Sequence, residues 1–307
     1  MTTRSAVTGA FSYTGKYITR LLLEQRQHVI TLTSRKDDQN LFDGQVQAYP
    51  FQFDNPKALA ETLRGVDTLY NTYWVRFDHG KATFNNAVEN TRTLIRAAKV
   101  AGVRRFVHVS ISNPTLESPL PYFSGKAQLE ENLKASGLSY AILRPTVIFG
   151  DEDILINNIA YLLRRFPLFA IPGAGEYQLQ PIFVEDMAQL AVDAGHREEN
   201  LTWDAVGPEI YTFNELVQLT RSVVGSRAGL INLPPSMVLQ LSRLIGFVVG
   251  DVVLTEEEIQ GLMANLLISA EPPTGKTSLR AWLRANANHV GSRYASELKR
   301  HYNAQNR

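Results

Sequence analysis

The sequence contains no cysteine among its 307 residues. This absence excludes disulfide bonds, thiolate metal ligands and a cysteine nucleophile, and it fits a reducing compartment. An excess of charge of one sign is also missing, because 31 lysines and arginines nearly balance 30 aspartates and glutamates. No overall field would therefore draw the chain to nucleic acid or to an anionic membrane, and we expect a small-molecule substrate, neutral or anionic, as the partner.

Long apolar runs are scarce as well. The N-terminal stretch MTTRSAVTGAF has neither a long apolar core nor a cleavage signature, so we expect no signal peptide and a cytoplasmic location. The most apolar later segment, residues 237–254, contains Arg243, Asp251 and two glycines, which makes it too polar for a membrane span. We interpret it as a packed helix, with a membrane-touching or dimer-forming surface as the alternative. The six histidines show no i, i+4 pairing and predict no metal site.

What the sequence does contain is an alternation of short β-rich apolar runs with longer segments of helical period, from SAVTGA to SYAILRPTVIFG. This order predicts repeated βαβ units, and hence an α/β fold with a doubly wound parallel sheet and helices on both faces. After Gly150 the pattern loosens, and proline, glycine and helical segments dominate. We therefore expect a sheet domain over residues 1–150 and a smaller, mainly helical substrate lobe over residues 151–307, partly interleaved with it.

The stretch VTGAFSYTG, residues 7–15, predicts a phosphate-binding turn. Gly9 and Gly15 bracket the passage from the first strand to the first helix, where unpaired N–H groups can hold a pyrophosphate. Ser12 occupies the position where a middle glycine is usual, and the turn can accommodate a serine if the φ angle of Ser12 is negative. The Ser12 hydroxyl could then donate a hydrogen bond to a phosphate oxygen. The alternative is an ordinary tight turn between strand and helix.

The next two strand ends carry groups suited to the adenosine half of a dinucleotide. About 20 residues after the glycine turn, a basic residue would accept a 2′-phosphate, and Arg35 and Lys36 stand there. They favour NADP(H) over NAD(H), unless they are only a solvated surface charge pair. Asp54 follows the third predicted strand, where it could receive the adenine amine or cap the helix that begins at Asn55 or Pro56.

A tyrosine and a lysine four residues apart open the helix after the fifth predicted strand. Tyr122 and Lys126 would lie on one helix face, and a nearby ammonium would lower the phenol pKa and fit Tyr122 for proton exchange. The strand before them ends in Ser110 and Ser112, and the latter could hold a substrate oxygen. The alternatives are a half-buried tyrosine with an exposed lysine, and serines that form a turn before Asn113.

The motifs TGAFSYTG, VDTLYNTYW, VHVSIS, YFSGK and ILRPTVIFG, in this order, resemble the short-chain dehydrogenase/reductase superfamily. Residues 144–186 resemble its atypical branch, which includes the 39-kDa-type accessory subunit of respiratory complex I and NmrA-like and NAD-dependent epimerase/dehydratase-like proteins. The resemblance covers residues 4–225 well. It implies a Rossmann-type domain that binds NAD(P).

The resemblance also implies a role for each matching position. Residues implied to contact the cofactor are Gly9, Ser12, Tyr13, Gly15, Arg35, Asp54, Asn71, Thr72, Tyr73, Ser110, Lys126, Pro145 and Thr146. Where the family is catalytic, the matching residues are Tyr122, Lys126 and Ser112. Only ten residues separate Ser112 from Tyr122, which leaves less room than the family's sugar-nucleotide enzymes have.

Two functions follow from this pattern. The first is an NADP(H)-dependent oxidoreductase that transfers hydride to or from a small carbonyl or alcohol, with Tyr122 as general acid or base. The second is a non-catalytic NADP(H) sensor or scaffold that binds a protein partner, for which residues 237–254 are the first candidate interface. The same scaffold can host both, so the sequence leaves this choice open.

Overall fold

The computed structural model of the chain describes residues 3–35 and 40–299. Lys36, which was expected beside Arg35, lies outside the described residues. The chain divides into two compact units, Met1–Pro145 with Val184–Ala205, and Thr146–Phe183 with Val206–Arg307. We call the first the sheet unit and the second the helical unit.

The sheet unit has seven strands and five helices among its described residues. The strands are β1 (Arg4–Thr8), β2 (His28–Leu32), β3 (Gln47–Tyr49), β4 (Thr68–Asn71), β5 (Arg105–Val109), β6 (Ser139–Pro145) and β11 (Leu201–Ala205). The helices are α1 (Tyr13–Glu24), α2 (Pro56–Leu63), α3 (Phe84–Ala101), α4 (Pro121–Lys134) and α6 (Val184–His196).

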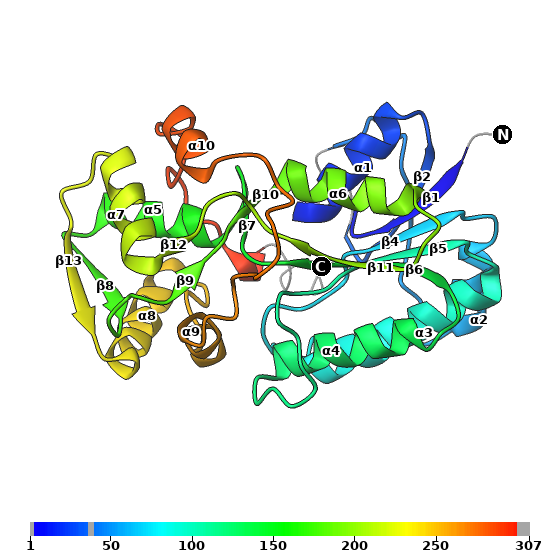
Figure 1. Ribbon diagram of the computed structural model, residues 1–307, viewed down its shortest axis with the longest axis horizontal. Coiled ribbons are helices and arrows are strands. Elements are labelled where there is room, and N and C mark those ends of the chain that lie inside the picture. The colour runs from blue at the N-terminus through cyan, green and yellow to red at the C-terminus, as the bar shows by residue number, and fades with distance from the viewer. Residues whose placement is uncertain (1–2, 36–39, 300–307) are drawn as a thin grey trace. The chain divides into compact units, whose positions relative to one another are not determined.

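All strands of the sheet run parallel, in the order β11-β6-β5-β4-β1-β2-β3. Helices α1 and α6 cover one face of the sheet, and α2, α3 and α4 cover the other (Figure 1). Buried apolar side chains of strands and helices, such as Leu69, Phe106 and Leu94, form the core beneath the second layer. The predicted doubly wound α/β fold is confirmed. Its strand order reverses between β1 and β4, the place where such sheets bind ligands.

The division between the units differs from the predicted boundary after residue 150. The chain leaves the sheet unit after Pro145 and returns for α6 and β11. It returns because β11 pairs with β6 over five residues, from Leu201 opposite Ala141 to Ala205 opposite Pro145, and α6 packs beside α1. These two elements therefore complete the sheet unit from a distant part of the sequence.

The helical unit consists of short strand pairs and helices. Its strands are β7 (Ile148–Phe149), β8 (Leu168–Pro172), β9 (Gln178–Leu179), β10 (Ile182–Phe183), β12 (Tyr211–Thr212) and β13 (Gly229–Leu233). Its helices are α5 (Leu155–Arg165), α7 (Phe213–Val223), α8 (Pro235–Val249), α9 (Glu256–Met263) and α10 (Leu279–Ala285).

Buried polar side chains at the start of α5 tie the helical unit together. Asp153 accepts a hydrogen bond at 2.6 Å from the amide of Ile156 in the first turn of the helix. The Asn157 side chain donates to Asp153 at 2.9 Å and accepts from the Gly291 amide at 3.1 Å. Asn158 exchanges two hydrogen bonds with the backbone of Ala295. These bonds fix the C-terminal part of the chain against α5.

The turn from β1 to α1 brings two backbone segments into direct contact. A Cβ atom on Gly15 would lie 2.2 Å from the carbonyl oxygen of Gly9, so only glycine fits there. Gly9 has a φ of +70°, and its amide donates to the Leu32 carbonyl at 2.8 Å. The end of β1, the end of β2 and the start of α1 are thereby held together.

We expect Gly15→Ala to destabilise the sheet unit by about 2 kcal/mol or more, because the added methyl group forces two backbones apart. Urea unfolding followed by circular dichroism measures this loss. Thr14→Ala is the control, since Thr14 is half-buried at the neighbouring position of the same helix. Equal stability of the two variants would mean that the close approach does not determine the turn.

Candidate functional site

The turn at the carboxyl end of β1 presents the N-terminus of α1. Ser12 is the N-cap residue of this helix with φ −104° and ψ 173°, so its φ is negative as the serine requires. Its side chain makes no capping hydrogen bond, which leaves helix N–H groups and a hydroxyl at the turn for a bound anion. Tyr13 and Gly15 follow in the first turn of the helix. The N-terminus of α1 is therefore not capped by the side chain of its own serine.

Arg35 lies beside this turn. Its side-chain Nη1 donates to the Phe11 carbonyl at 3.4 Å, and its amide donates to Thr33 Oγ1 at 3.0 Å. The guanidinium group at the end of β2 therefore reaches back to the loop between Gly9 and Ser12. The guanidinium group thus lies at the edge of the turn, where it can contact an anionic group.

The start of α2 excludes one of the two roles predicted for Asp54, that of capping this helix. Asn55, not Asp54, caps α2, because its side chain accepts from the Ala58 amide at 3.2 Å and Pro56 occupies the first helical position. Asp54 is exposed just before this cap. Proline fixes the start of the helix and thereby selects the residue before it as the cap, so capping does not account for Asp54.

Three aromatic rings gather between the ends of β3 and β4. Phe51 and Phe53 stack at 4.9 Å, and the ring of Tyr73 lies 5.0 and 5.1 Å from them. The Tyr73 hydroxyl accepts from the Asn90 side chain at 2.9 Å, and burial raises the pKa of this phenol. The predicted cofactor residue Tyr73 is thus held in an apolar cluster.

A buried polar network joins the ends of β1, β4 and β5. The Asn71 side-chain oxygen accepts from Thr8 Oγ1 at 3.1 Å, and its amide nitrogen lies 3.0 Å from His108 Nδ1. Thr72 exchanges two further bonds with Thr8, at 2.6 and 2.7 Å. Burial, followed by the charge of Lys126, holds the pKa of His108 well below its usual range. The imidazole is therefore neutral, and its Nδ1 accepts the Asn71 amide.

Tyr122 opens α4 as predicted, and its ring is half-buried among other aromatic rings. Trp74, Phe123 and Phe84 lie 5.7, 5.7 and 5.9 Å from it, centroid to centroid. Trp74 approaches α4 closely because Gly125 has no side chain; a Cβ atom there would lie 3.0 Å from the indole. The wall of the candidate site around Tyr122 is therefore aromatic.

Lys126 is only 2% exposed, in contrast to the exposed lysine of the alternative interpretation. Its Nζ atom donates to the Val109 carbonyl at 2.7 Å and lies 4.5 Å from the centroid of the Trp74 ring. Burial lowers the pKa of Lys126 to about 7, and the nearby Glu130 carboxylate opposes this shift. The amine is therefore enclosed between the Val109 carbonyl and the Trp74 ring.

The two serines after β5 are buried. Ser110 donates to Glu130 Oε1 at 2.6 Å, and Arg144 binds the same carboxylate through both oxygens, at 3.0 and 2.5 Å. Ser112 is fully buried, and its amide donates to the Pro145 carbonyl at 2.8 Å. Strand β5 ends at Val109, but this bonding continues its pairing with β6 through both serines.

The last two predicted cofactor residues fall on either side of the unit boundary. Pro145 ends β6 in the sheet unit, and Thr146 begins the helical unit. The Thr146 hydroxyl donates to the carbonyl of Gln180 within the helical unit. This hydroxyl already has a partner of its own.

Sequence reasoning missed two features of this site. Glu130, four residues after Lys126 on α4, had the helical spacing that could have revealed it, but its partner Arg144 comes from β6. The second feature is the contact of Trp74 with Lys126, which no sequence pattern signals. Among the described residues, no group of three histidines, aspartates or glutamates could hold a metal ion, and none of the described helices is long and apolar enough to cross a membrane.

Residues 9–159 match the model of a family described as NAD(P)H-binding. The chain is 24% identical to the mitochondrial NADH-ubiquinone oxidoreductase 40 kDa subunit of Neurospora crassa, over 89% of this chain and 74% of that protein. It is 20% identical to the mitochondrial NADH dehydrogenase [ubiquinone] 1 alpha subcomplex subunit 9 of Arabidopsis thaliana, over 86% and 71%. It is 27% identical to the photosystem II assembly factor Ycf39 of Guillardia theta, over 52% and 50%.

Solved structures show the same fold. An NADPH-dependent quinone oxidoreductase of Escherichia coli, complexed with NADPH, matches with a TM-score of 0.73 and 21% identity over 93% of this chain and 99% of that chain. A nucleoside-diphosphate-sugar epimerase of Staphylococcus aureus matches with a TM-score of 0.72 and 18% identity over 92% and 99%. The predicted similarity to NAD(P)-binding proteins and to the mitochondrial NADH dehydrogenase subunits is confirmed.

We expect Lys126→Met to change how stability depends on pH. In the unfolded chain a lysine keeps its proton up to about pH 10.4, whereas burial lowers the folded pKa to about 7. Between these values the unfolded chain binds more protons, so wild-type stability rises with pH and is lost as pH falls through 7. From pH 7 to pH 9 the wild type should gain about 2 kcal/mol over the variant in urea unfolding. Parallel curves would contradict a buried neutral amine.

Proposed function

Because the chain carries a domain of the NAD(P)H-binding family over residues 9–159, we propose that it binds NADP(H) at the carboxyl end of β1 and β2. The observation that carries this proposal is the position of Arg35, whose guanidinium contacts the Phe11 carbonyl in the phosphate turn. An arginine there can pair with a 2′-phosphate, which NAD(H) lacks.

The residues at the turn fit such a ligand. Gly15 lets α1 approach Gly9 closely. The Ser12 hydroxyl makes no hydrogen bond that caps α1. The pyrophosphate would lie on the first N–H groups of α1, with Arg35 at the adenosine end. When bound, the cofactor supplies a hydride; the protein supplies the binding site and its charge.

Binding without turnover is the function that the described geometry supports best. Lys126 is buried beside Trp74, Ser110 is bonded to Glu130, and Ser112 is fully buried. None of these three groups offers an open polar atom to a ribose or a substrate. Relatives named as a subunit and as an assembly factor support a role in which the bound nucleotide governs association with protein.

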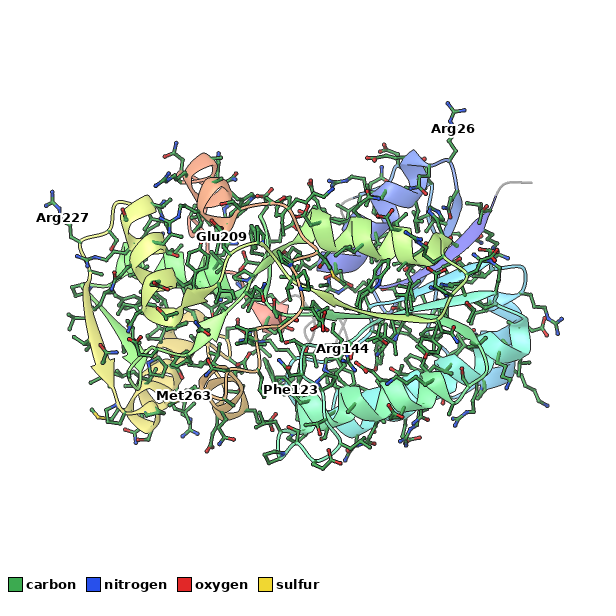
Figure 2. The ribbon with its side chains drawn as sticks, viewed as in Figure 1. Arg26, Phe123, Arg144, Glu209, Arg227 and Met263 are labelled. Atoms are coloured by element: carbon green, nitrogen blue, oxygen red, sulfur yellow. The ribbon has the colours of Figure 1, made fainter. Side chains whose placement is uncertain are left out.

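We expect Arg35→Ala to weaken NADPH binding by about 10- to 100-fold, the value of one charge-assisted contact to a phosphate, and to leave NADH binding nearly unchanged. Calorimetric titration of NADPH, NADH and 2′,5′-ADP into protein freed of nucleotide measures both effects. Arg227→Ala is the control for the lost charge, because this arginine extends away from the ribbon into solvent (Figure 2).

Equal losses for NADPH and NADH would remove Arg35 from phosphate recognition. Failure of all three ligands to bind the wild-type protein would exclude the proposed function altogether. Binding of 2′,5′-ADP as tightly as NADPH would indicate that the adenosine end supplies the affinity and that the end near Lys126 is closed.

A second candidate function is an NADP(H)-dependent oxidoreductase acting on a small carbonyl or alcohol. Its support is the half-exposed Tyr122, four residues before Lys126 on α4 and enclosed by aromatic rings that suit an apolar substrate. In this role the Tyr122 hydroxyl would give its proton to the substrate oxygen. Lys126, which already donates to the Val109 carbonyl, would use another of its three N–H groups toward the ligand.

If this activity exists, Tyr122→Phe should lower NADPH consumption with an accepted aldehyde or quinone by at least about 100-fold and leave NADPH affinity unchanged. Absorbance at the NADPH band follows the reaction. Tyr140→Phe is the control, because Tyr140 is a half-buried tyrosine near the opposite, amino end of β6. Undiminished turnover in Tyr122→Phe would exclude the tyrosine as the acid.

A further inference from the structure

Helix α8 in the helical unit carries an exposed apolar stripe. Phe247 is 91% exposed, Val248 78% and Leu244 67%, and Met237 and Leu241 are exposed as well. Four of these residues follow the spacing 237, 241, 244, 248, which places them on one side of the helix. The interpretation of residues 237–254 as a packed helix therefore does not hold for this side of α8, where the surface alternative applies.

The other side of α8 is firmly held. Val238, Ser242 and Gly246 are buried, and Gly246 allows the backbone of Asp251 to approach so closely that a Cβ atom would lie 2.6 Å from its carbonyl oxygen. The Asp251 carboxylate accepts from the amides of Glu297 and Leu298 at 2.8 and 3.0 Å. The exposed stripe thus belongs to an anchored helix.

The charges around the stripe disfavour a lipid surface. Arg243 is the only charged residue of α8, whereas membrane-surface helices carry several basic residues beside their apolar face. The acidic run Glu256, Glu257 and Glu258 begins α9 shortly afterwards and would be repelled by anionic lipid. An uncharged apolar face is better matched by another apolar protein face.

The spacing of the stripe is the same in both directions, with steps of four, three and four residues. Two copies of α8 that pair antiparallel about a twofold axis would place Met237 opposite Val248 and Leu241 opposite Leu244. Such an interface is self-complementary, since each copy offers the residues that the other needs. We propose that α8 joins two copies of this chain into an antiparallel helix-paired dimer.

The area of the stripe agrees with such a dimer. A buried aromatic side chain covers about 150–250 Å². Phe247, on the flank of the stripe, and the four smaller apolar side chains of the stripe together offer on the order of 600 Å² per copy. Two copies would remove about 1,200 Å² from water, the lower end of specific protein interfaces. This inference concerns assembly alone and does not depend on the proposed nucleotide binding.

Analytical ultracentrifugation of the full chain up to about 100 μM tests the proposal. We expect a reversible dimer for the wild type, and at least a 100-fold weaker one for Leu244→Lys, which places a charge at the centre of the pair. Val248→Lys should weaken the dimer too, whereas Val100→Lys should not. Val100 is a valine of similar exposure, 73%, also near the C-terminal end of its helix, α3. Circular dichroism spectra that match the wild type would show that each variant folds.

A double variant tests the direction of pairing. In Leu241→Glu/Leu244→Lys, antiparallel helices bring opposite charges together and should dimerise at least 10-fold more tightly than Leu244→Lys alone. Parallel helices would bring like charges together and would not recover, which would overturn the proposed arrangement. A wild-type chain that stays monomeric, or binds vesicles through α8 instead, would overturn the dimer itself.

Discussion

The contact between Gly15 and the Gly9 carbonyl is the constraint on which the candidate site depends. It fixes the start of α1 against the end of β1, the strand at which the sheet order reverses. Ser12 and Arg35 acquire their positions from this contact, because the turn lies between the ends of β1 and β2. A longer or looser turn would move the helix N-terminus away from the arginine, and a dinucleotide could not contact both.

Most polar groups in the rest of the site are hydrogen-bonded within the protein, but His108 Nε2 and Trp74 Nε1 are buried with no hydrogen-bond partner among the described residues. Asn71 is hydrogen-bonded to Thr8 and His108. The Glu130 carboxylate accepts hydrogen bonds from Ser110 and Arg144. Lys126 donates a hydrogen bond to the Val109 carbonyl. These buried hydrogen bonds stabilise one arrangement and resist change, because each lost partner leaves a desolvated group. They are the basis on which we propose nucleotide binding without turnover.

The local features of this fold could be predicted from sequence, and the distant contacts could not. Glycine spacing predicted the turn at Gly9 and Gly15, and helical spacing predicted that Tyr122 opens α4, because both patterns act within a few residues. The contact of Trp74 with Lys126 joins the ends of β4 and β5 to α4, and only the folded sheet brings them together. The same holds for β11, a five-residue strand that carries no signal of its partner β6.

The position of α6 and β11 late in the sequence also affects how the sheet unit folds during synthesis. Until residues 184–205 have left the ribosome, β6 is an edge strand with unpaired backbone groups, and α1 lacks its neighbour on that face of the sheet. The sheet unit can therefore be completed only after residues 146–183, the first part of the helical unit, have been synthesised. During synthesis the nascent chain passes through a stage in which an incomplete sheet is exposed, a form open to chaperones and to mispairing.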